Sequence, residues 1–328
     1  TTEIYTLSLH DALPIWGIET LRELLGGLPA NLPASLFVVQ HRAPFSINGV
    51  LTRVIGRQST LPIREPVDQQ PPALGQVYLA PPAHHLLLQP EKMRVIRGPK
   101  ENFVRPALDV LFRSAAVAYG PRVIAVVLSG NLDDGSAGSQ AVKRCGGIAV
   151  VQDPKDAMFP DMPANAMTQG PADHVVRLAE MSKVLEELVR QPAPAAAQPP
   201  EDLRKEVEMS MGSYELLDGD EKPLWSPYVC PECGGALADV PNADPPRYRC
   251  HVGHSFTEQS LIADQSESTE RVLWAAIRAL EERAKLLRSM AAHSRQRGAE
   301  ISAADYSRES EQSRAHAEHI RGWFTTSE

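Results

Sequence analysis

The sequence predicts an α/β fold with a doubly wound, mostly parallel sheet, followed by a small zinc-ribbon-like unit and a C-terminal helix. Short apolar runs alternate with helical stretches over residues 16–190, a pattern typical of a parallel sheet covered by helices on both faces. A stretch rich in Pro and Ala then breaks this pattern, and a Cys-x-x-Cys motif follows it. The chain has 328 residues, which is enough for two domains.

The predicted strands and helices of the first region alternate along the chain. Six short runs rich in Val, Ile and Leu are expected to be strands: Leu36–Val39, Gln76–Ala80, His85–Leu88, Val123–Leu128, Ile148–Val151 and His174–Val176. Helices are expected at Ile18–Leu25, Ala107–Tyr119, Ala137–Cys145 and Glu180–Val189. Glycines and a proline separate helices from the strands that follow, at Gly120-Pro121 and Gly146-Gly147.

The second region divides into four segments by composition. Residues 191–222 open with a Pro/Ala-rich run and are predicted to be a semi-rigid linker. Residues 223–258 contain the cysteine pattern, and residues 259–298 form a predicted amphipathic helix. Its apolar seam, about three heptads long, favours packing on its own domain or on one partner helix over a long coiled coil: Leu273, Ile277, Leu280, Ala284, Leu287 and Ala291. Residues 299–328 are expected to be a polar, frayed tail.

Composition excludes several classes of protein. The formal net charge of −8 argues against a general polyanion binder. No apolar run reaches 18 residues, so no membrane insertion is expected. Four cysteines in a chain of this length do not make a disulfide framework, and three of them cluster in a metal-type pattern, which predicts a reducing, cytoplasmic location. Cys145 is interpreted as a small buried apolar residue.

Two side chains with catalytic chemistry directly follow strand-like runs. His41 comes after the run that ends at Val39, and Asp134 follows the run that ends at Leu128. In an open α/β sheet, sites are built at the carboxyl ends of the strands. A His and an Asp at that edge make two thirds of a hydrolytic triad, and the third member would be a Ser at the end of an earlier strand.

Five sequence blocks in this order resemble the catalytic domain of the chemotaxis protein-glutamate methylesterase family (CheB). Each block is weak alone, but the order and the spacing of the five are specific. The five blocks are Val38-Val-Gln-His41, Gly75-Gln-Val-Tyr-Leu-Ala-Pro-Pro-Ala-His-His85, Arg105-Pro-Ala-Leu-Asp-Val-Leu-Phe112, Leu128-Ser-Gly130 with Asp134-Gly135, and Gly147-Ile-Ala-Val-Val-Gln-Asp-Pro154.

The resemblance implies a hydrolase that cleaves γ-methyl esters of glutamate on methyl-accepting chemotaxis receptors, and that in many family members also deamidates receptor glutamines. It implies that His41 is the general base and Asp134 the acid that orients it, with no cofactor for catalysis. Asp133 is the alternative acid; Asp134 is preferred because Gly135 follows it, as in the family's Asp-Gly pair. Most family members have Gly-Met-Gly earlier in this loop, where this chain has Gly130-Asn131-Leu132. The Asn131 amide could itself donate a hydrogen bond to an oxyanion, which the sequence alone does not show.

The serine nucleophile of this family is missing from its expected position. The family opens with an apolar strand and a Gly-Ala-Ser-Ala/Thr-Gly-Gly turn; aligning its last glycine with Gly17 places Pro14 at the serine. Proline has no hydroxyl and cannot act as a nucleophile. Residues 1–15 resemble translated sequencing-adapter DNA, so our hypothesis is that a non-native segment replaces the true first strand and serine turn. The alternative is a pseudo-enzyme that has lost its serine.

The cysteine pattern of residues 223–258 predicts a structural zinc site. Cys230 and Cys233 form a Cys-x-x-Cys turn, and Cys250 and His254 complete a tetrahedral Cys3His set. His254 is preferred over His251 because its spacing leaves a turn for the chain to bend back. No basic stripe with interleaved aromatic residues accompanies the ribbon, so no nucleic-acid binding is expected. A similar C-terminal extension occurs on some stand-alone members of the same family.

Three functions therefore stand at this point. The preferred one is a protein-glutamate methylesterase whose present chain, without the serine, has little or no activity. The alternatives are a non-catalytic scaffold that binds receptor helices and a zinc-ribbon nucleic-acid-binding module.

Overall fold

The computed structural model describes residues 3–9, 14–41, 49–170, 172–212, 224–241, 243 and 245–325. Clustering of contacts divides the chain into two compact units, Thr1–Leu261 and Ile262–Glu328.

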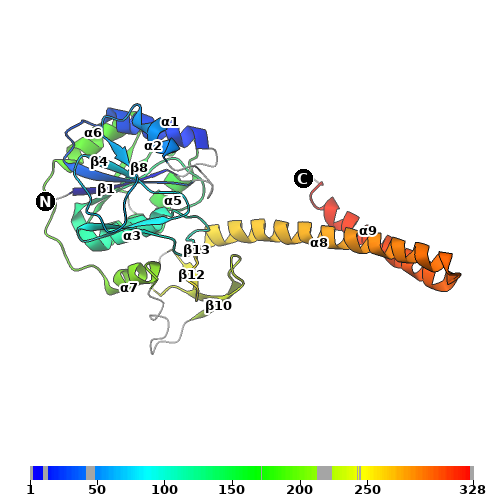
Figure 1. The fold of residues 1–328 in the computed structure, drawn as a ribbon. Coiled ribbons are helices and arrows are strands. Elements are labelled where there is room, and N and C mark those ends of the chain that lie inside the picture. Colours follow the sequence, from blue (N-terminus) through cyan, green and yellow to red (C-terminus); the bar gives the residue numbers. More distant parts are fainter. Residues whose placement is uncertain are drawn as a thin grey trace. The chain divides into compact units, whose positions relative to one another are not determined.

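The first unit is built around a parallel sheet (Figure 1). Over the described residues it has seven strands in the order β3-β4-β2-β1-β7-β8-β9, and every neighbouring pair is parallel. The strands are β1 (Glu3–Leu9), β2 (Ala34–Gln40), β3 (Ile63–Arg64), β4 (Gln76–Leu79), β7 (Val123–Val127), β8 (Ile148–Gln152) and β9 (His174–Val176). The strands β2 and β7 are buried at every position, as expected for a sheet covered on both faces.

Helices cover both faces of this sheet, so the predicted doubly wound α/β fold is confirmed. One face carries α1 (Pro14–Gly27), α2 (Val50–Gly56) and α6 (Leu178–Val189). The other carries α3 (Leu108–Tyr119), α4 (Ser136–Arg144) and α5 (Asp161–Gln169), and a 3-10 turn over Gly120–Arg122 joins α3 to β7. Alternate side chains of β2 point to opposite faces: Leu36 and Val38 join the first core, and Phe37 joins the second.

The expectation that the first strand is missing is wrong for this structure. Residues Glu3–Leu9 form β1, which lies between β2 and β7 in parallel register. The segment resembles translated adapter DNA, but Ile4, Tyr5 and Thr6 are residue types that favour strands. The hypothesis that residues 1–15 are non-native concerns their origin and stays a prediction.

Two further segments differ from their predictions. His85–Gln89 is strand β5, but it pairs with β6 (Lys92–Ile96) in an antiparallel hairpin instead of joining the main sheet. The segment predicted as a linker contains helix α7 (Glu201–Ser210), whose Leu203 and Val207 are buried. These two residues are four apart and so lie on one face of a helix, a pattern too short to separate from the surrounding polar sequence.

The ribbon is an antiparallel sheet of four strands in the described part of residues 224–257. Its strands are β10 (Trp225–Val229), β11 (Ala236–Asp239), β12 (Arg247–Cys250) and β13 (Ser255–Thr257). Its apolar core is small and consists of Cys230, Leu237, Tyr248, Cys250, Phe256 and Leu261, with Phe103 of the α/β layers packed against it. Such a core is too small to stabilise the sheet without another constraint.

A buried ionic cluster joins the ribbon to the α/β layers. Glu206 of α7 lies at its centre: its carboxylate accepts a hydrogen bond from Arg247 at 2.8 Å and lies 3.4 Å from Arg113 of α3 and 3.5 Å from Arg249. Glu101 pairs with Arg113 as well. Burial opposes ionisation of Glu206, but the charges of Arg113 and Arg247 outweigh it and hold the pKa of Glu206 well below its usual range.

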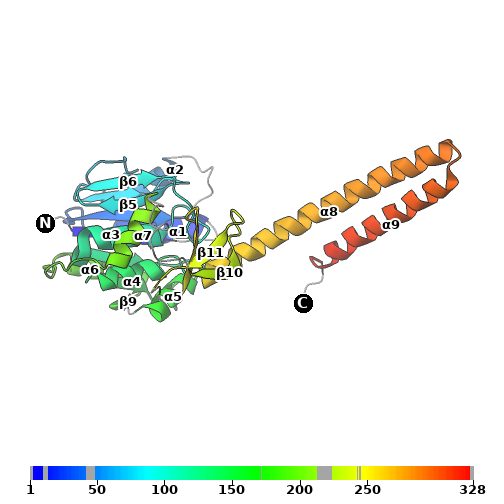
Figure 2. The same ribbon diagram turned by 90° about the horizontal axis from the view of Figure 1, so that it is seen from below.

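The second unit is a helical hairpin. Helix α8 (Glu258–Gln296) continues into this unit, and α9 (Glu300–Gly322) runs back along it (Figure 2). Ile277, Ala284, Leu287 and Ala291 of the predicted seam are buried, and α9 meets them with small buried residues: Ala303, Ser310, Ser313 and Ala317. The prediction of a frayed polar tail is therefore wrong, because small side chains at heptad spacing allow close helix packing without a strongly apolar sequence.

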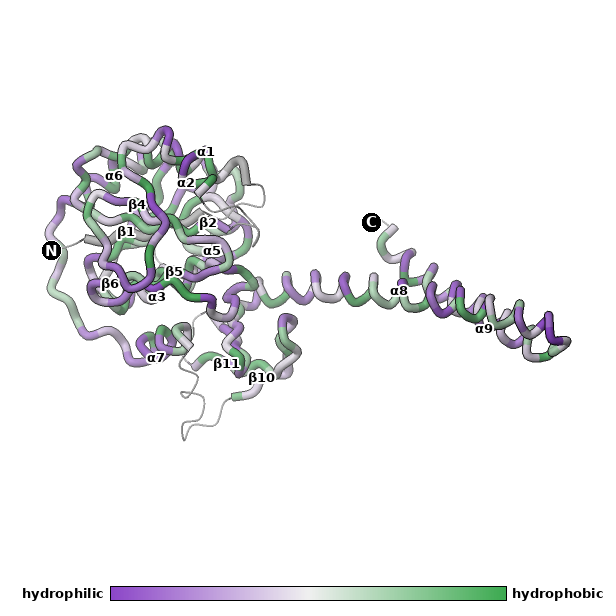
Figure 3. The backbone as a smooth tube through the Cα atoms, in the orientation of Figure 1, coloured by the Kyte–Doolittle hydropathy of each residue, from purple (hydrophilic) through white to green (hydrophobic). Residues whose placement is uncertain are grey.

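Polar residues predominate along both helices of the hairpin, whereas apolar residues gather in the strands of the sheet (Figure 3). Within the described residues, no helix combines the length and the apolar character required to cross a bilayer.

Candidate functional site

The order of the strands locates the crevice where a site is expected. After β1 the chain forms β2, β3 and β4 on one side of β1, and it then crosses to form β7, β8 and β9 on the other. Ligands of open α/β sheets bind outside the carboxyl ends of the strands at such a switch point. His41 directly follows β2, and the loop after β7 carries Asp134. These two strands flank β1 on either side.

The structure brings His41 and Asp134 together although they are 93 residues apart in the sequence. Nε2 of His41 lies 2.8 Å from Oδ2 of Asp134, and the two side chains are 8% and 3% exposed. With Nε2 facing the carboxylate, Nδ1 is the ring nitrogen through which His41 would exchange a proton with a nucleophile. A carboxylate in this position fixes the imidazole tautomer and stabilises the imidazolium.

The amino end of α3 holds the Asp134 carboxylate in place. The backbone N–H of Leu108 donates to Oδ2 at 2.7 Å, and that of Asp109 donates to Oδ1 at 3.1 Å. Asp134 thus satisfies first-turn N–H groups that have no partner within the helix, and its charge is favoured by the helix dipole. Burial alone would raise the pKa of Asp134, but the hydrogen bond and charge of His41 and the N–H donors lower it below its usual value.

Asp133, the alternative acid, faces a different partner. Its Oδ1 accepts a hydrogen bond from the Thr257 hydroxyl at 3.0 Å, and Thr257 belongs to the ribbon. Burial is the main cause that raises the pKa of Asp133 to about 6. The geometry therefore favours Asp134 as the partner of His41.

Asp109 is a second buried carboxyl beside Asp134 to which the sequence assigned no role. Its Oδ1 accepts hydrogen bonds from the N–H groups of Gly135 at 2.9 Å and Gly138, at the amino end of α4. Asp134 and Asp109 therefore cap each other's helices. Burial first, and the charge of Asp134 next, raise the pKa of Asp109 to about 8. Its only signal in the sequence was its place in the block from Arg105 to Phe112.

Gly135 is required by the packing of this loop. Its φ of 99° is a conformation that side chains disfavour, and a Cβ atom there would lie 2.2 Å from Cδ2 of Leu108. Because Leu108 also donates its N–H to Asp134, the glycine allows the loop to approach α3 closely enough for that hydrogen bond. This explains in physical terms why a glycine follows the acid.

The part of the loop that departs from the family pattern is held by other contacts. Leu132 has a positive φ of 62°, and its carbonyl accepts a hydrogen bond from Asn165 at 2.7 Å. Asn131 precedes it on the same loop and is half-buried. Pro14, at the position expected for the serine, is the first residue of α1.

His85 is a structural residue in this geometry. It is buried; its Nε2 donates to the Pro99 carbonyl at 2.8 Å, and its Nδ1 accepts the Ala107 N–H at 3.2 Å. Burial lowers the pKa of His85 to about 4, so the ring stays neutral at pH 7.

The predicted metal ligands also converge. The ligand atoms of Cys230, Cys233, Cys250 and His254 all lie within 4.8 Å of one another. Nδ1 of His254 lies 3.7 Å from Sγ of Cys230 and 3.6 Å from Sγ of Cys250, and the Cys233 and Cys250 sulfurs are 3.7 Å apart. A tetrahedral zinc with ordinary bond lengths requires ligand atoms roughly 3.6–3.8 Å apart, so the donor set fits this ion.

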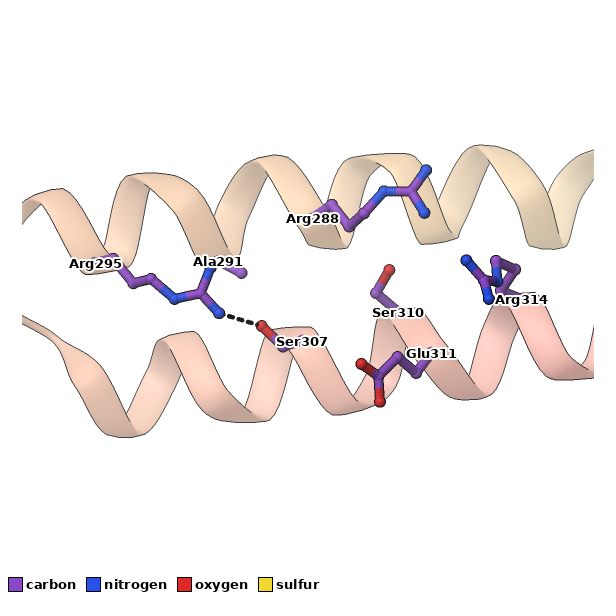
Figure 4. A pocket seen from close by; sticks show the side chains of 7 residues that line it. All are labelled: Arg288, Ala291, Arg295, Ser307, Ser310, Glu311 and Arg314. Atoms are coloured by element: carbon purple, nitrogen blue, oxygen red, sulfur yellow. Dashed lines mark hydrogen bonds between the residues drawn. The ribbon is translucent and has the colours of Figure 1, made fainter.

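A separate hollow lies between the two helices of the hairpin (Figure 4). Its lining consists of Arg288, Ala291, Arg295, Ser307, Ser310, Glu311 and Arg314. Arg295 donates to the Ser307 hydroxyl at 2.8 Å, and Glu311 lies on α9 among the arginines. The lining contains neither the His–Asp pair nor the metal ligands, so this hollow has no part in the chemistry described above.

Comparison with known proteins agrees with this fold. The family model described as CheB methylesterase matches residues 15–185. A protein of Leptospira interrogans, provisionally named protein-glutamate methylesterase/protein-glutamine glutaminase, is 34% identical over 169 residues, which cover 51% of this chain and 87% of that protein. A protein-glutamate methylesterase/protein-glutamine glutaminase of Methanosarcina mazei is 32% identical, and the match covers 53% of this chain but only 49% of that protein.

Among solved structures, the catalytic domain of the Thermotoga maritima CheB methylesterase is similar, with a TM-score of 0.53 and 31% identity. The match covers 57% of this chain and 99% of the Thermotoga chain. The parallel sheet with its covering helices, the matched residues and the relatives lead to one conclusion: the chain belongs to the CheB methylesterase family, a family of carboxylic ester hydrolases.

Proposed function

We propose that the α/β domain is built to hydrolyse glutamyl γ-methyl esters on methyl-accepting chemotaxis receptors in the cytoplasm. The observation that carries this proposal is the 2.8 Å contact between His41 and Asp134 at the switch point of the sheet. The names of the relatives support the same substrate, and they also suggest a second reaction, deamidation of glutamine.

The reaction requires a serine hydroxyl at the start of α1. His41 takes the proton of that hydroxyl while its oxygen forms a bond to the ester carbonyl carbon, and Asp134 stabilises the imidazolium. The carbon–methoxy bond then breaks, and His41 gives the proton to the departing methoxy oxygen. Methanol dissociates, and the acyl group stays bound to the serine as an acyl-enzyme. Water repeats the same steps and releases the glutamate carboxylate. With a glutamine substrate, ammonia leaves in place of methanol.

The chain with Pro14 at the serine position is proposed to have little or no esterase activity. The test replaces residues 1–17 of the full-length chain with the first strand and Gly-x-Ser-x-Gly-Gly turn of the Thermotoga maritima catalytic domain. We expect methanol release from methylated receptor by this serine-restored chain and not by the original. In the restored chain, Asp134→Asn should lower kcat by about 10³- to 10⁴-fold, and Asp133→Asn should lower it far less.

A restored chain that binds receptor but releases no methanol would favour the non-catalytic scaffold instead. The origin of residues 1–15 has its own test, which is to resequence the source locus. A Gly-x-Ser-x-Gly-Gly codon run directly upstream of Gly17 would support the hypothesis of a non-native segment. If the locus instead encodes residues 1–15 as they stand, in frame with Gly17, the result would support a pseudo-enzyme.

We also propose that Cys230, Cys233, Cys250 and His254 hold a structural zinc ion. The spacing of their ligand atoms supports this, and a set of four protein ligands leaves no open position for chemistry at the metal. Elemental analysis of the purified full-length chain should give one zinc per chain. Cys233→Ser should lower the zinc content, and Cys145→Ser, at the cysteine outside the cluster, should leave it unchanged. Equal zinc content in both variants would contradict the assignment.

A further inference from the structure

The first turn of α8 carries a network of hydrogen bonds that the zinc site and the catalytic pair leave unexplained. Thr257 precedes the helix, and its Oγ1 accepts the N–H of Ser260 at 3.1 Å. In return, Oγ of Ser260 accepts the N–H of Thr257 at 2.9 Å. This is a capping box in which a serine takes the place of the usual Glu or Gln. Both side chains are almost completely buried.

The hydroxyl hydrogens of this capping box point beyond the helix. The Thr257 hydroxyl lies 3.0 Å from Oδ1 of Asp133 and 2.9 Å from Oγ of Ser260, and the carboxylate is the stronger of these two acceptors. Ser260 lies 3.1 Å from Oδ1 of Asn102 and 3.2 Å from the Thr257 carbonyl, so the Asn102 oxygen is the nearer acceptor. A cap that served only α8 would need neither contact. These contacts instead connect the ribbon and α8 to the loop that carries the catalytic pair.

Asn102 connects the capping box to the acid. Its Nδ2 donates to Oδ2 of Asp109 at 3.0 Å and to Oδ1 of Asp134 at 3.2 Å. Its Oδ1 receives the Ser260 hydroxyl and, at 3.3 Å, the Thr257 N–H. The hydrogen-bond network assigns this orientation of the amide, because a flipped amide would present its oxygen to the ionised Asp134 carboxylate and its N–H group to the Thr257 N–H.

The backbone of Asn102 is also hydrogen-bonded to the ribbon. Its N–H donates to the carbonyl of Ser255 in β13 at 2.8 Å, and its φ is positive at 51°. Asparagine tolerates this left-handed conformation better than other non-glycine residues do. The side chain is 4% exposed, so the bond to Asp134 forms in a low-dielectric interior where a hydrogen bond to a charge is strong.

From these contacts we propose that the ribbon and the α8 capping box complete the esterase active site: Thr257 and Ser260 hold Asn102, and Asn102 is a positioning residue that keeps the Asp134 carboxylate aimed at His41. This inference rests on the proposed function, because it assigns Asp134 the role of orienting His41. It implies that binding of the metal in the ribbon and the geometry of the acid are coupled.

The first experiment measures steady-state kinetics in the serine-restored full-length chain. Asn102→Ala should lower kcat roughly ten- to hundredfold with little change in KM, since a hydrogen bond to a buried charge is lost. Ser260→Ala should lower kcat by a smaller factor, about three- to tenfold. Ser260→Thr, which keeps the hydroxyl, should recover most of the rate.

The matched control is Ser266→Ala, which removes a hydroxyl from the same helix that bonds only to the Ile262 carbonyl. Its kcat should equal that of the parent. The proposal is overturned if Asn102→Ala and Ser260→Ala keep the parental kcat, or if their rates fall only in proportion to the fraction of folded protein.

A second experiment needs no activity and uses the original chain with Pro14. The amide proton of Leu108 bonds directly to Asp134, so its NMR shift follows the ionisation of Asp134 as the pH changes. Asn102→Ala and removal of zinc by a chelator should both move the midpoint of this titration upward, whereas Ser266→Ala should not move it. An unchanged midpoint in Asn102→Ala refutes the connection. If the titration moves but the serine-restored chain releases no methanol, the proposed function fails and the connection stands.

Discussion

The α/β layers and the ribbon are stabilised by different interactions although they belong to one compact unit. The layers bury two large apolar clusters, one on each face of the sheet, and their strands carry few polar side chains. The ribbon has a small apolar core, two of whose members are the proposed metal ligands Cys230 and Cys250. It meets the layers through charged and polar side chains.

The apolar clusters stabilise the fold, whereas the charged and polar contacts set the geometry and the pKa values of the site. Apolar burial is insensitive to pH, metal and small changes of geometry, so it suits a scaffold. Buried charges and metal ligands are stable only when every partner is in place. The residues next to the acid, Asn102, Asp109 and Asp133, belong to this second kind of interaction, and through Thr257 they depend on the ribbon.

Removing the metal should have the largest effect and should act on the ribbon first. Apparent binding free energies of structural zinc are about 10–16 kcal/mol, and in such small domains they are also folding free energies. With chelator present, we expect proteases to cleave within residues 224–257 while residues 49–170 stay protected, as mass spectrometry of the fragments would show. If both regions lost their protection from proteases together, the α/β layers would also depend on the metal, and the proposed difference between the layers and the ribbon would be wrong.

Breaking the ionic cluster should have the next largest effect. Glu206→Gln leaves Arg113, Arg247 and Arg249 buried without their central carboxylate, and losing one partner of a buried ion pair costs about 3–5 kcal/mol. Chemical denaturation should show this loss of stability. The control Glu187→Gln, in an exposed pair with Lys183, should change the free energy of unfolding by about 0.5 kcal/mol or less. Equal effects would mean that solvent screens the buried cluster.

The carboxyl groups beside the proposed catalytic pair and the ionic cluster should respond oppositely to pH, with a smaller effect on stability than the two changes above. Folding raises the pKa of Asp109 to about 8 and that of Asp133 to about 6, both from 3.8. Their contribution is fully present below about pH 4, because the folded chain then binds no more protons than the unfolded one, and it is lost as the pH rises toward 8. Glu206 has a lowered pKa, so its contribution is present above its usual pKa and is lost as the pH falls below it.

Denaturation measured from pH 4 to 9 would test the direction in which the free energy of unfolding changes with pH. We expect the free energy of unfolding to fall with rising pH, by an amount on the order of a few kcal/mol for the site carboxyls together. In Asp133→Asn, whose side-chain oxygen can still accept the Thr257 hydroxyl, the decrease between pH 4 and 6 should be smaller than in the parent. A decrease of the same size would exclude Asp133 as its source.

Most of the α/β layers could be predicted from the sequence because their signals are local. Buried parallel strands are short runs of Val, Ile and Leu, and turns between them carry glycine and proline. The predictions for Leu36–Val39 and Val123–Leu128 therefore lie within one or two residues of β2 and β7. The prediction failed for α7 and α9, whose helical faces are made of few or small apolar residues, and for β5, whose partner strand could not be chosen from its own sequence.

The sequence by itself determined which residue types were available: a histidine and an aspartate after two strands, four metal-binding side chains at ribbon spacing, and a proline where a serine is expected. Only the tertiary structure showed that Asp134 lies against His41 while Asp133 faces Thr257, and only it showed Asn102 and Ser260 beside them. The physical reason is that a carboxyl group acquires its pKa and its partner from burial and from neighbours that are distant in the sequence, and no local pattern encodes either.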